Sequence, residues 1–308
     1  MKQKSLTLSI VIVSFNTKEK LRHCLSCLEL DRHEIIVVDN ASKDNSPELV
    51  KLEFPTVILI ENDQNVGFGR ANNLGIDRST GDLILYLNSD AYVKPGAIEE
   101  LVDAFQNEQV IAAGPKLLNM DGSLQESVAG PLTLTNVFLE QTYLDAIARK
   151  IGKGYWRTRT VQNEPVSDVD QVMGACMMMR SKSNQKFDER FFLYCEDTEL
   201  CYRLSSLGKI VYVRNAEVTH ELGSSSIDSR WKSVARYNLG KELYFRIHHG
   251  AVAASVCWLL NRTGAFLRLL VGLVLAPFSR SGREKVTIFS KVLFANRDSV
   301  IPLEHRSR

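Results

Sequence analysis

The sequence predicts an α/β protein: an open, mostly parallel, Rossmann-like sheet flanked by helices, with an apolar and basic helical extension at the C-terminus. Three observations lead to this fold class. Short runs of valine, isoleucine and leucine alternate with helical stretches over the first 115 residues. The runs are almost continuously apolar, which is typical of parallel strands covered on both faces. The 308 residues suffice for one such domain and an extension.

Each of the first four apolar runs ends in polar residues, so each is expected to be a strand that points toward one edge of the sheet. The expected strands are residues 8–13, 34–38, 57–60 and 83–87, and the expected helices are about 17–30, 45–53, 69–79 and 95–106. Open α/β sheets bind ligands beyond the carboxyl ends of their strands. Asn16, Asp39 and Asp90 are therefore predicted to face one crevice.

The middle of the chain is less regular. Residues 116–165 contain several glycines and read as loops and short helices. A further strand is expected at about 169–180, a helix from Glu196, a strand over 210–213 and a helix over 231–249. His220 is expected in a short loop after the strand over 210–213.

The net charge of +2 conceals an asymmetry. From Arg230 to Arg308 the chain carries 14 basic and 4 acidic residues, whereas residues 1–229 carry 24 basic and 32 acidic residues. A basic tail with long aliphatic runs favours an anionic membrane surface over a nucleic acid. We expect a catalytic domain of residues 1–230, followed by a helical, basic, membrane-associating extension of residues 231–308.

Residues 251–278 are strongly apolar, but Asn261, Arg262, Thr263 and Arg268 interrupt them. The uninterrupted pieces are shorter than the roughly 20 apolar residues of a membrane-spanning helix. An interfacial or re-entrant segment is expected, with a buried hairpin of core helices as the alternative. The charged residues do not line up on one clean helical face.

The cysteines and the N-terminus bear on the compartment. Cys24 and Cys27 form a lone C-x-x-C within an expected helix, which indicates small buried apolar residues and a reducing cytosol. No small-residue cleavage site follows the first apolar run, so no signal peptide is predicted. With the basic tail, these features predict a peripheral protein on the cytoplasmic face of the inner (plasma) membrane.

Two strand ends carry side chains suited to a nucleotide. Asp39 ends a buried strand, where its carboxylate can accept a hydrogen bond from a pyrimidine N3–H or cap the following turn. In Asn88-Ser89-Asp90, the one carboxylate can hold Mg²⁺ or Mn²⁺ whose remaining ligands are phosphates, or again cap a turn. His220 is a structural residue on its own and a metal or phosphate ligand if it lies near Asp90.

Acidic residues crowd the start of the helix expected at Glu196. Glu196, Asp197 and Glu199 can stabilise the helix dipole. The apolar residues 191–194 just before them would raise a carboxylate pKa and so favour a general base. Arg203, four residues after Glu199, is positioned to pair with it.

A glycine-bearing segment, residues 67–70, is neither a P-loop nor a dinucleotide fingerprint, which argues against an ATPase or an NAD enzyme. A nucleotidyltransferase would carry a Gly-rich, basic loop after the first strand, where this chain has Ser14-Phe15-Asn16. A non-catalytic sugar- or membrane-binding module would not need the Glu196-Asp197 pair together with Asp39 and Asp90.

Seven segments, read in order, resemble the inverting family-2 glycosyltransferases of the GT-A fold. They are VSFN at 13–16, VVDNAS at 37–42, NVGFGRANNLGI at 65–76, LYLNSDA at 85–91, GACMMMR at 174–180, FDERFFLYCEDTELCYR at 187–203 and the segment around His220. The chain is most similar to the bacterial rhamnosyltransferase-like branch of that family. The resemblance covers about residues 7–226, and the ordered set is more specific than any single motif.

The resemblance implies roles for matching residues. Asp197, with Glu196 beside it, would be the catalytic base, and Asp90 and His220 would lie at the Mg²⁺ or Mn²⁺. Asn88 occupies the first acidic position of the family's D-x-D-type motif, which is a departure. The expected donor-binding residues are Ser14, Asn16, Asp39, Asn40, Arg70, Asn73, Asn88 and Ser89.

The resemblance also implies an activity. It is the metal-dependent, inverting transfer of a sugar from a dTDP or UDP sugar to a lipid-linked saccharide, in cell-surface polysaccharide synthesis. The branch favours rhamnose from dTDP-rhamnose. Galactofuranose, N-acetylglucosamine and mannose remain open, because fold-level analogy gives limited information about substrate.

Overall fold

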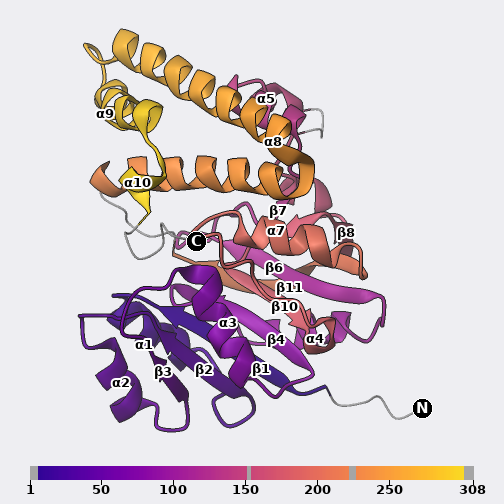
Figure 1. Cartoon of the computed structure of the whole chain (residues 1–308). Helices are drawn as coiled ribbons and strands as arrows, with labels where there is room; N and C mark the ends of the chain where they lie inside the picture. Colours follow the sequence, from indigo (N-terminus) through magenta and orange to yellow (C-terminus); the bar gives the residue numbers. More distant parts are fainter. Residues whose placement is uncertain (1–5, 151–153, 222–226, 302–308) are drawn as a thin grey trace. The chain divides into compact units, whose positions relative to one another are not determined.

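The structure is a computed structural model that describes residues 6–150, 154–221 and 227–301 (Figure 1). The chain forms two compact units. Unit 1 consists of Met1–Gly130, Trp156–Glu189 and Asp197–Gly223, and unit 2 consists of Pro131–Tyr155, Arg190–Glu196 and Ser224–Arg308.

Unit 1 is built on a nine-stranded sheet with the order β3-β2-β1-β4-β10-β6-β11-β5, and β8 pairs with β11. Strands β3, β2, β1 and β4 are parallel, as are β6 and β11, whereas β10 runs antiparallel between β4 and β6. The strands are β1 Leu8–Ser14, β2 Glu34–Asp39, β3 Ile58–Glu61, β4 Leu83–Asn88, β5 Ala91–Val93, β6 Val110–Leu118, β8 Val166–Val169, β10 Cys176–Arg180 and β11 Lys209–His220. A small second sheet pairs β7 (Val128–Ala129) with β9 (Gln171–Val172).

Helices cover both faces of this sheet because alternate strand residues point to opposite sides. Ile10 and Ile12 of β1 belong to one buried cluster with residues of α1, α2 and α4, while Val11 belongs to a second cluster with residues of α3 and α7. The helices are α1 Lys18–Ser26, α2 Ser46–Glu53, α3 Phe68–Arg78, α4 Ala97–Ala104 and α7 Glu196–Leu204. The predicted α/β fold is thus confirmed.

Several predictions for the middle of the chain are wrong. Val110–Leu118, expected in part as loop, is a buried strand despite Gly114 and Pro115, because its neighbours β10 and β11 pair with it. The single strand expected at 169–180 is interrupted between β9 and β10. The last expected strand continues past residue 213 through a register shift, so His220 ends β11 and does not lie in a loop.

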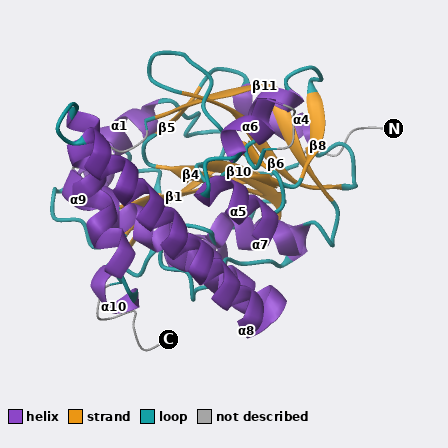
Figure 2. Ribbon diagram, turned by 90° about the horizontal axis from the view of Figure 1, so that it is seen from above, coloured by secondary structure: helices purple, strands orange, loops and turns teal. Residues whose placement is uncertain are grey.

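Unit 2 is helical. It contains α5 (Leu134–Gln141), α6 (Asp145–Lys150), α8 (Ile227–Leu275), α9 (Arg280–Phe294) and α10 (Arg297–Val300). Helix α8 is kinked at Gly250, whose φ of 84° and ψ of 176° suit glycine alone, so it has two arms (Figure 1). Helices α8 and α9 pack side by side (Figure 2). The short helix η1 (Thr158–Val161) belongs to unit 1.

The second arm of α8 has an inverted distribution of side chains. Its buried face, at helical spacing, is small or polar: Ala254, Cys257, Asn261, Gly264, Ala265 and Gly272. Its exposed face is large and apolar: Val252, Val256, Leu259, Phe266, Leu270, Leu273 and Val274. A helix of a water-soluble domain buries its large apolar side chains instead.

The two arginines that interrupt this apolar segment donate hydrogen bonds to backbone carbonyls of neighbouring helices. Arg268 donates to the carbonyl oxygens of Glu140 (2.8 Å) and Gln141 (3.1 Å), at the C-terminal end of α5. Arg262 donates to the carbonyl oxygens of Val292 (2.6 Å) and Leu293 (2.8 Å), at the end of α9. Free carbonyls at helix ends need such donors, so these two cations leave the outer face apolar.

Within the described residues, one helix is long and apolar enough to cross a membrane by length and composition. It is Arg230–Leu275, and 22% of its most apolar 18-residue window is buried.

Candidate active site

The carboxyl ends of β2, β1 and β4 lie next to one another at one edge of the sheet. Ser14 of β1 is in register with Asp39 of β2, and Val13 with Asn88 of β4. Neighbouring strands are about 4.8 Å apart, so Asp39 and Asn88 lie about 10 Å apart across β1. This edge can hold the base of a nucleotide near Asp39 and its phosphates near Asn88.

Asp39 is buried, with 2% of its surface exposed. Its Oδ2 accepts a hydrogen bond from the Ser42 amide at 2.8 Å. Its Oδ1 is buried and has no hydrogen-bond partner in the described part of the chain. Burial raises the pKa of Asp39. An unsatisfied buried acceptor costs roughly 1–3 kcal/mol, and an N–H group of a ligand would remove that cost.

A network of short polar side chains ties the three strand ends together. The Ser14 and Thr17 hydroxyls are 3.0 Å apart, and the Thr17 and Ser89 hydroxyls are 2.9 Å apart. Asn16, in the left-handed region with a φ of 53°, accepts from the Lys43 amide at 2.7 Å. Ser14, Asn16 and Ser89 therefore lie at the predicted edge, where they also shape the loops around it.

Asn40 and Asn73 use their side chains to position two neighbouring segments. The Oδ1 of Asn40 accepts from the Val66 amide at 2.9 Å. Asn73 donates to the Phe187 carbonyl and accepts from the Phe187 amide, both at 2.9 Å. Arg70 lies 3.7 Å from Glu189. The donor contacts expected of these three residues stay a prediction.

Asp90 and His220 lie together although 130 positions separate them in the sequence. Antiparallel pairing of β5 with β11 sets His220 opposite Ala91. The His220 Nε2 is 3.3 Å from the Asp90 Oδ1 and 3.4 Å from the Asn88 Nδ2. His220 is 6% exposed.

Gln125 determines which nitrogen of the His220 ring carries a proton. Its Nε2 donates to the Asn119 side chain at 2.8 Å and to the His220 carbonyl at 3.1 Å. The Oε1 of Gln125 therefore faces the His220 Nδ1, at 2.8 Å, and must accept its proton. In the neutral ring this leaves a lone pair on Nε2, directed at the Asp90 carboxylate.

This arrangement fits a divalent cation. Two hydrogen-bond acceptors, the His220 Nε2 and the Asp90 Oδ1, face each other at 3.3 Å. The Asn88 Oδ1 is buried with no partner among the described residues. Carboxylate, amide and imidazole are ligand types that Mg²⁺ or Mn²⁺ accepts. Among the described residues, no group of three or more His, Cys, Asp or Glu side chains is placed to hold a metal ion, so phosphate oxygens would have to complete the coordination.

Sequence reasoning missed a cation beside this pair. The Lys20 Nζ is 3.2 Å from Glu221 and 4.0 Å from Asp90, and the Tyr92 hydroxyl donates to Glu221 at 2.9 Å. Neither Lys20 nor Gln125 is marked by a local pattern, because the folded sheet alone brings them to Asp90. Lys20 is thus a cation near the place where a diphosphate would lie, and it is paired there with Glu221.

Asp197 is held by backbone amides. Its Oδ2 accepts from Gly174 at 2.9 Å and its Oδ1 from Thr198 at 2.7 Å. The approach at residue 174 is close, because a Cβ there would lie 3.2 Å from the Asp197 Cβ. Burial raises the pKa of Asp197, although these amides act in the opposite direction. The backbone amide of Asn88 donates to the Ala175 carbonyl at 2.9 Å, which joins this loop to the end of β4.

The other acidic residues of α7 are buried. Glu196 is 5% exposed. Glu199 forms two hydrogen bonds of 2.8 Å with Arg203, which confirms the predicted pair and gives this carboxylate a structural role. Just before the helix, Tyr194 and Cys195 have φ values of 76° and 69°. Such backbone strain in two consecutive residues is characteristic of functional segments.

Residues 9–185 match the sequence model of a known family, described as glycosyl transferase family 2. The chain belongs to this family. The glycosyltransferase is 26% identical, over 91% of its length and 97% of the other protein, to the N-acetylglucosaminyl-diphospho-decaprenol L-rhamnosyltransferase of Mycobacterium tuberculosis. It is 28% identical to the low-salt glycan biosynthesis hexosyltransferase Agl10 of Haloferax volcanii, over 64% of this chain and 61% of that protein.

Solved structures confirm the GT-A fold of the glycosyltransferase. The mannosyltransferase PcManGT from Pyrobaculum calidifontis, solved with GDP-Man and Mn²⁺, gives a TM-score of 0.55 at 13% identity, over 94% of this chain and 88% of that one. GalNAc-T7, solved with UDP, GalNAc and Mn²⁺, gives 0.54 at 16% identity, over 79% of this chain and 50% of that one.

We expect Mn²⁺ to bind the full-length glycosyltransferase in the presence of dTDP. Asp90→Ala should weaken binding at least tenfold because it removes the one carboxylate ligand. Gln125→Leu should weaken it roughly 10–100-fold, as expected when the partner that orients a ligating histidine is lost. Electron paramagnetic resonance of free Mn²⁺ measures both effects. Asp103→Ala, on α4, is the matched control, and an unchanged affinity in folded Asp90→Ala protein would contradict the metal site.

Proposed function

We propose that this family-2 glycosyltransferase transfers L-rhamnose from dTDP-rhamnose, with inversion, to a lipid-linked saccharide in cell-surface polysaccharide synthesis. One observation carries the proposal. The buried Oδ1 of Asp39, the Asp90–His220 pair and the amide-held Asp197 are joined through strands β2, β1, β4 and β10 of a protein whose family transfers sugars.

The base of the donor would be read by Asp39. Its Oδ1 needs a donor, and the N3–H of a pyrimidine supplies one. Thymine and uracil both carry this group, so the contact suits dTDP and UDP sugars alike. A purine nucleotide such as GDP offers a differently shaped base, which makes a GDP donor a weaker match.

The diphosphate would lie at Asn88, Asp90 and His220. These residues would hold Mg²⁺ or Mn²⁺, which when bound neutralises the charge of the leaving group. Lys20, 4.0 Å from Asp90, would add a fixed positive charge. Charge that is already in place at the leaving group is commonly the largest contribution to catalysis.

The Asp197 carboxylate would take the proton from the acceptor hydroxyl. The acceptor oxygen then forms a bond to the anomeric carbon, on the face opposite the diphosphate. The bond from that carbon to the diphosphate oxygen breaks, and the nucleoside diphosphate leaves with the electron pair. A single displacement of this kind inverts the anomeric centre. The raised pKa of Asp197 suits this role because it increases basicity. Glu196 is the neighbouring candidate.

The choice of rhamnose and of a lipid-linked acceptor is supported by the relative from Mycobacterium tuberculosis, whose name states L-rhamnose and a diphospho-decaprenol acceptor. At 26% identity, galactofuranosyl, N-acetylglucosaminyl and mannosyl transfer stay open as alternatives within the same fold. A non-catalytic sugar- or membrane-binding module is the alternative from another class, and it would release no nucleoside diphosphate.

We also propose a peripheral location on the cytoplasmic side of the inner membrane, and the inverted face of α8 supports its membrane-surface part. Large side chains such as Val274, 70% exposed, and Phe278, 86% exposed, would enter the boundary between head groups and acyl chains. The basic residues of unit 2 would attract anionic lipids.

Asp197→Asn should lower turnover roughly 10²-fold or more, because an amide cannot accept the acceptor proton. Affinity for dTDP should stay within about twofold, since Asp197 is not among the expected donor-binding residues and the asparagine oxygen still accepts from one of the two backbone amides. Turnover and dTDP titration measure the two effects, and Asp103→Asn is the control. Wild-type turnover should fall on acidification through a pKa above the usual aspartate value of about 3.9. Near-normal turnover by folded Asp197→Asn protein would exclude the residue as the base.

The wild-type enzyme should consume dTDP-rhamnose in preference to other donors. We suggest incubating it with equal dTDP-rhamnose, UDP-galactofuranose, UDP-N-acetylglucosamine and GDP-mannose, plus Mn²⁺ and membrane lipid extract, and measuring each released diphosphate. Consumption of another sugar alone would refute rhamnose and leave glycosyl transfer intact. If no donor is consumed, the non-catalytic alternative is favoured.

The full-length protein should float with anionic vesicles at low salt. Leu259→Glu/Phe266→Glu should weaken vesicle binding by tenfold or more, because each side chain contributes roughly 1.5–3 kcal/mol when it leaves water. Leu52→Glu, at an exposed site on α2, is the matched control. A wild-type protein that stays at the bottom of the gradient would show the membrane proposal to be wrong.

A further inference from the structure

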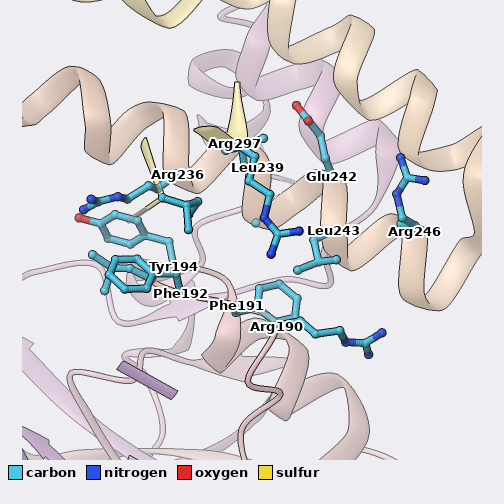
Figure 3. A pocket seen from close by; sticks show the side chains of 13 residues that line it. Arg190, Phe191, Phe192, Tyr194, Arg236, Leu239, Glu242, Leu243, Arg246 and Arg297 are labelled. Atoms are coloured by element: carbon cyan, nitrogen blue, oxygen red, sulfur yellow. The ribbon is translucent and has the colours of Figure 1, made fainter. Parts of the chain in front are cut away.

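Unit 2 contains a pocket with a volume of about 330 Å³ (Figure 3). Three parts of the chain line it: residues 190–194, the first arm of α8, and the region of α10. All of its lining residues belong to unit 2. The volume is within the range of small-molecule sites.

Four arginines line this pocket. They are Arg190, Arg236, Arg246 and Arg297, and Glu242 is the one acidic residue of the lining. The side chain of Arg297 points from α10 toward residues 190–194 (Figure 3). Like charges around one cavity repel each other, so the formal excess of three positive charges favours an anion. Guanidinium groups match phosphate oxygens in geometry.

One of these arginines is held in place. The Arg236 Nε donates to the Val300 carbonyl at 2.8 Å, and its guanidinium lies 5.2 Å from the centre of the Phe192 ring. Partial burial lowers the pKa of Arg236. A bound anion would compensate for this desolvation. Glu242 is also fixed, because Asn261 donates to its Oε1 at 2.9 Å.

The remainder of the lining is apolar. Phe191, Phe192, Leu193, Leu239, Leu243 and Ile301 contribute to it. An inorganic phosphate would gain nothing from these side chains, whereas a phosphorylated lipid would cover them. The inverted apolar face of α8 belongs to the same unit, so unit 2 has both a surface for acyl chains and a basic pocket.

We propose that this arginine pocket binds the diphosphate and the first isoprene unit of a polyprenyl diphosphate, the carrier of the acceptor saccharide. The inference deepens the proposed function and rests on it for the identity of the acceptor. Tyr194 lines the pocket and precedes Asp197 by three residues, so the pocket segment continues directly into the helix that carries the proposed base.

Calorimetric titration of the full-length protein tests the pocket with three probes: farnesyl diphosphate, farnesol and inorganic diphosphate. Saturating dTDP and EDTA keep the probes from the donor and metal site. Farnesyl diphosphate should bind at least tenfold more tightly than either other probe, because it alone uses both the arginines and the apolar lining.

Arg246→Gln should weaken farnesyl diphosphate binding roughly tenfold, and Arg190→Gln/Arg246→Gln should weaken it further, as expected for lost charge-assisted hydrogen bonds. Both arginines are exposed at the pocket, so these variants should fold. Arg280→Gln, an exposed arginine on α9 that does not line the pocket, is the matched control and should leave the affinity unchanged.

Unchanged affinity in the double variant would overturn the proposal, as would inorganic diphosphate binding as tightly as farnesyl diphosphate. Consumption of dTDP-rhamnose by the wild-type protein, with Mn²⁺ and membrane lipid extract, tests the proposed function separately. If no nucleotide sugar is consumed but lipid binding depends on the arginines, glycosyl transfer fails and the pocket stands. If donor is consumed but lipid binding ignores the arginines, the pocket alone fails.

Discussion

The pairing of β4 between β1 and β10 is the constraint on which the candidate site of unit 1 depends. On one side, Asn88 is in register with Val13. On the other, Leu87 pairs with Cys176, and the Asn88 amide donates to Ala175. Strand β4 therefore fixes the register of both neighbouring strands. Through β1 it connects Asp39, at the end of β2, with the loop that holds Asp197. A slip of one residue would reverse the direction of every side chain of β4.

The first half of the fold could be predicted because its strands are continuous apolar runs that end at turn residues. Each of those four strands was located to within about one residue. No strand was expected over β6, whose run of apolar residues contains Gly114 and Pro115, two residues that are uncommon inside strands. The structure shows the reason for the glycine: a Cβ at position 114 would lie 2.6 Å from the Val172 Cβ. Such a close approach depends on a residue far along the chain, so no local pattern reports it.

The residues of the candidate site also fall into two groups, those that local sequence identifies and those that only the fold reveals. Asp39, Asp90 and Asp197 were found because strand ends and helix starts are local features. The partners that define their chemistry were not: Gln125 orients His220 across 95 positions, and Lys20 approaches Asp90 from α1. The sequence likewise shows where an asparagine stands but not which groups its side chain bonds to. Tertiary hydrogen bonds alone reveal that Asn40 and Asn73 position neighbouring segments.

The C-terminal tail shows how polar residues can hide an amphipathic helix from a reading of the sequence alone. Arg262 and Arg268 obscured the amphipathic face of α8, yet both are used on helix-end carbonyls, which leaves the apolar face intact.

Contacts within unit 2 explain the strained backbone of Tyr194 and Cys195. A side chain at Gly240 would lie 2.7 Å from the Tyr194 carbonyl, so glycine lets α8 pack against this turn and hold it. Packing thus fixes a short segment that lines the basic pocket at one end and leads into Asp197 at the other. Recognition of the lipid carrier in unit 2 would then depend on a turn that this packing holds in place.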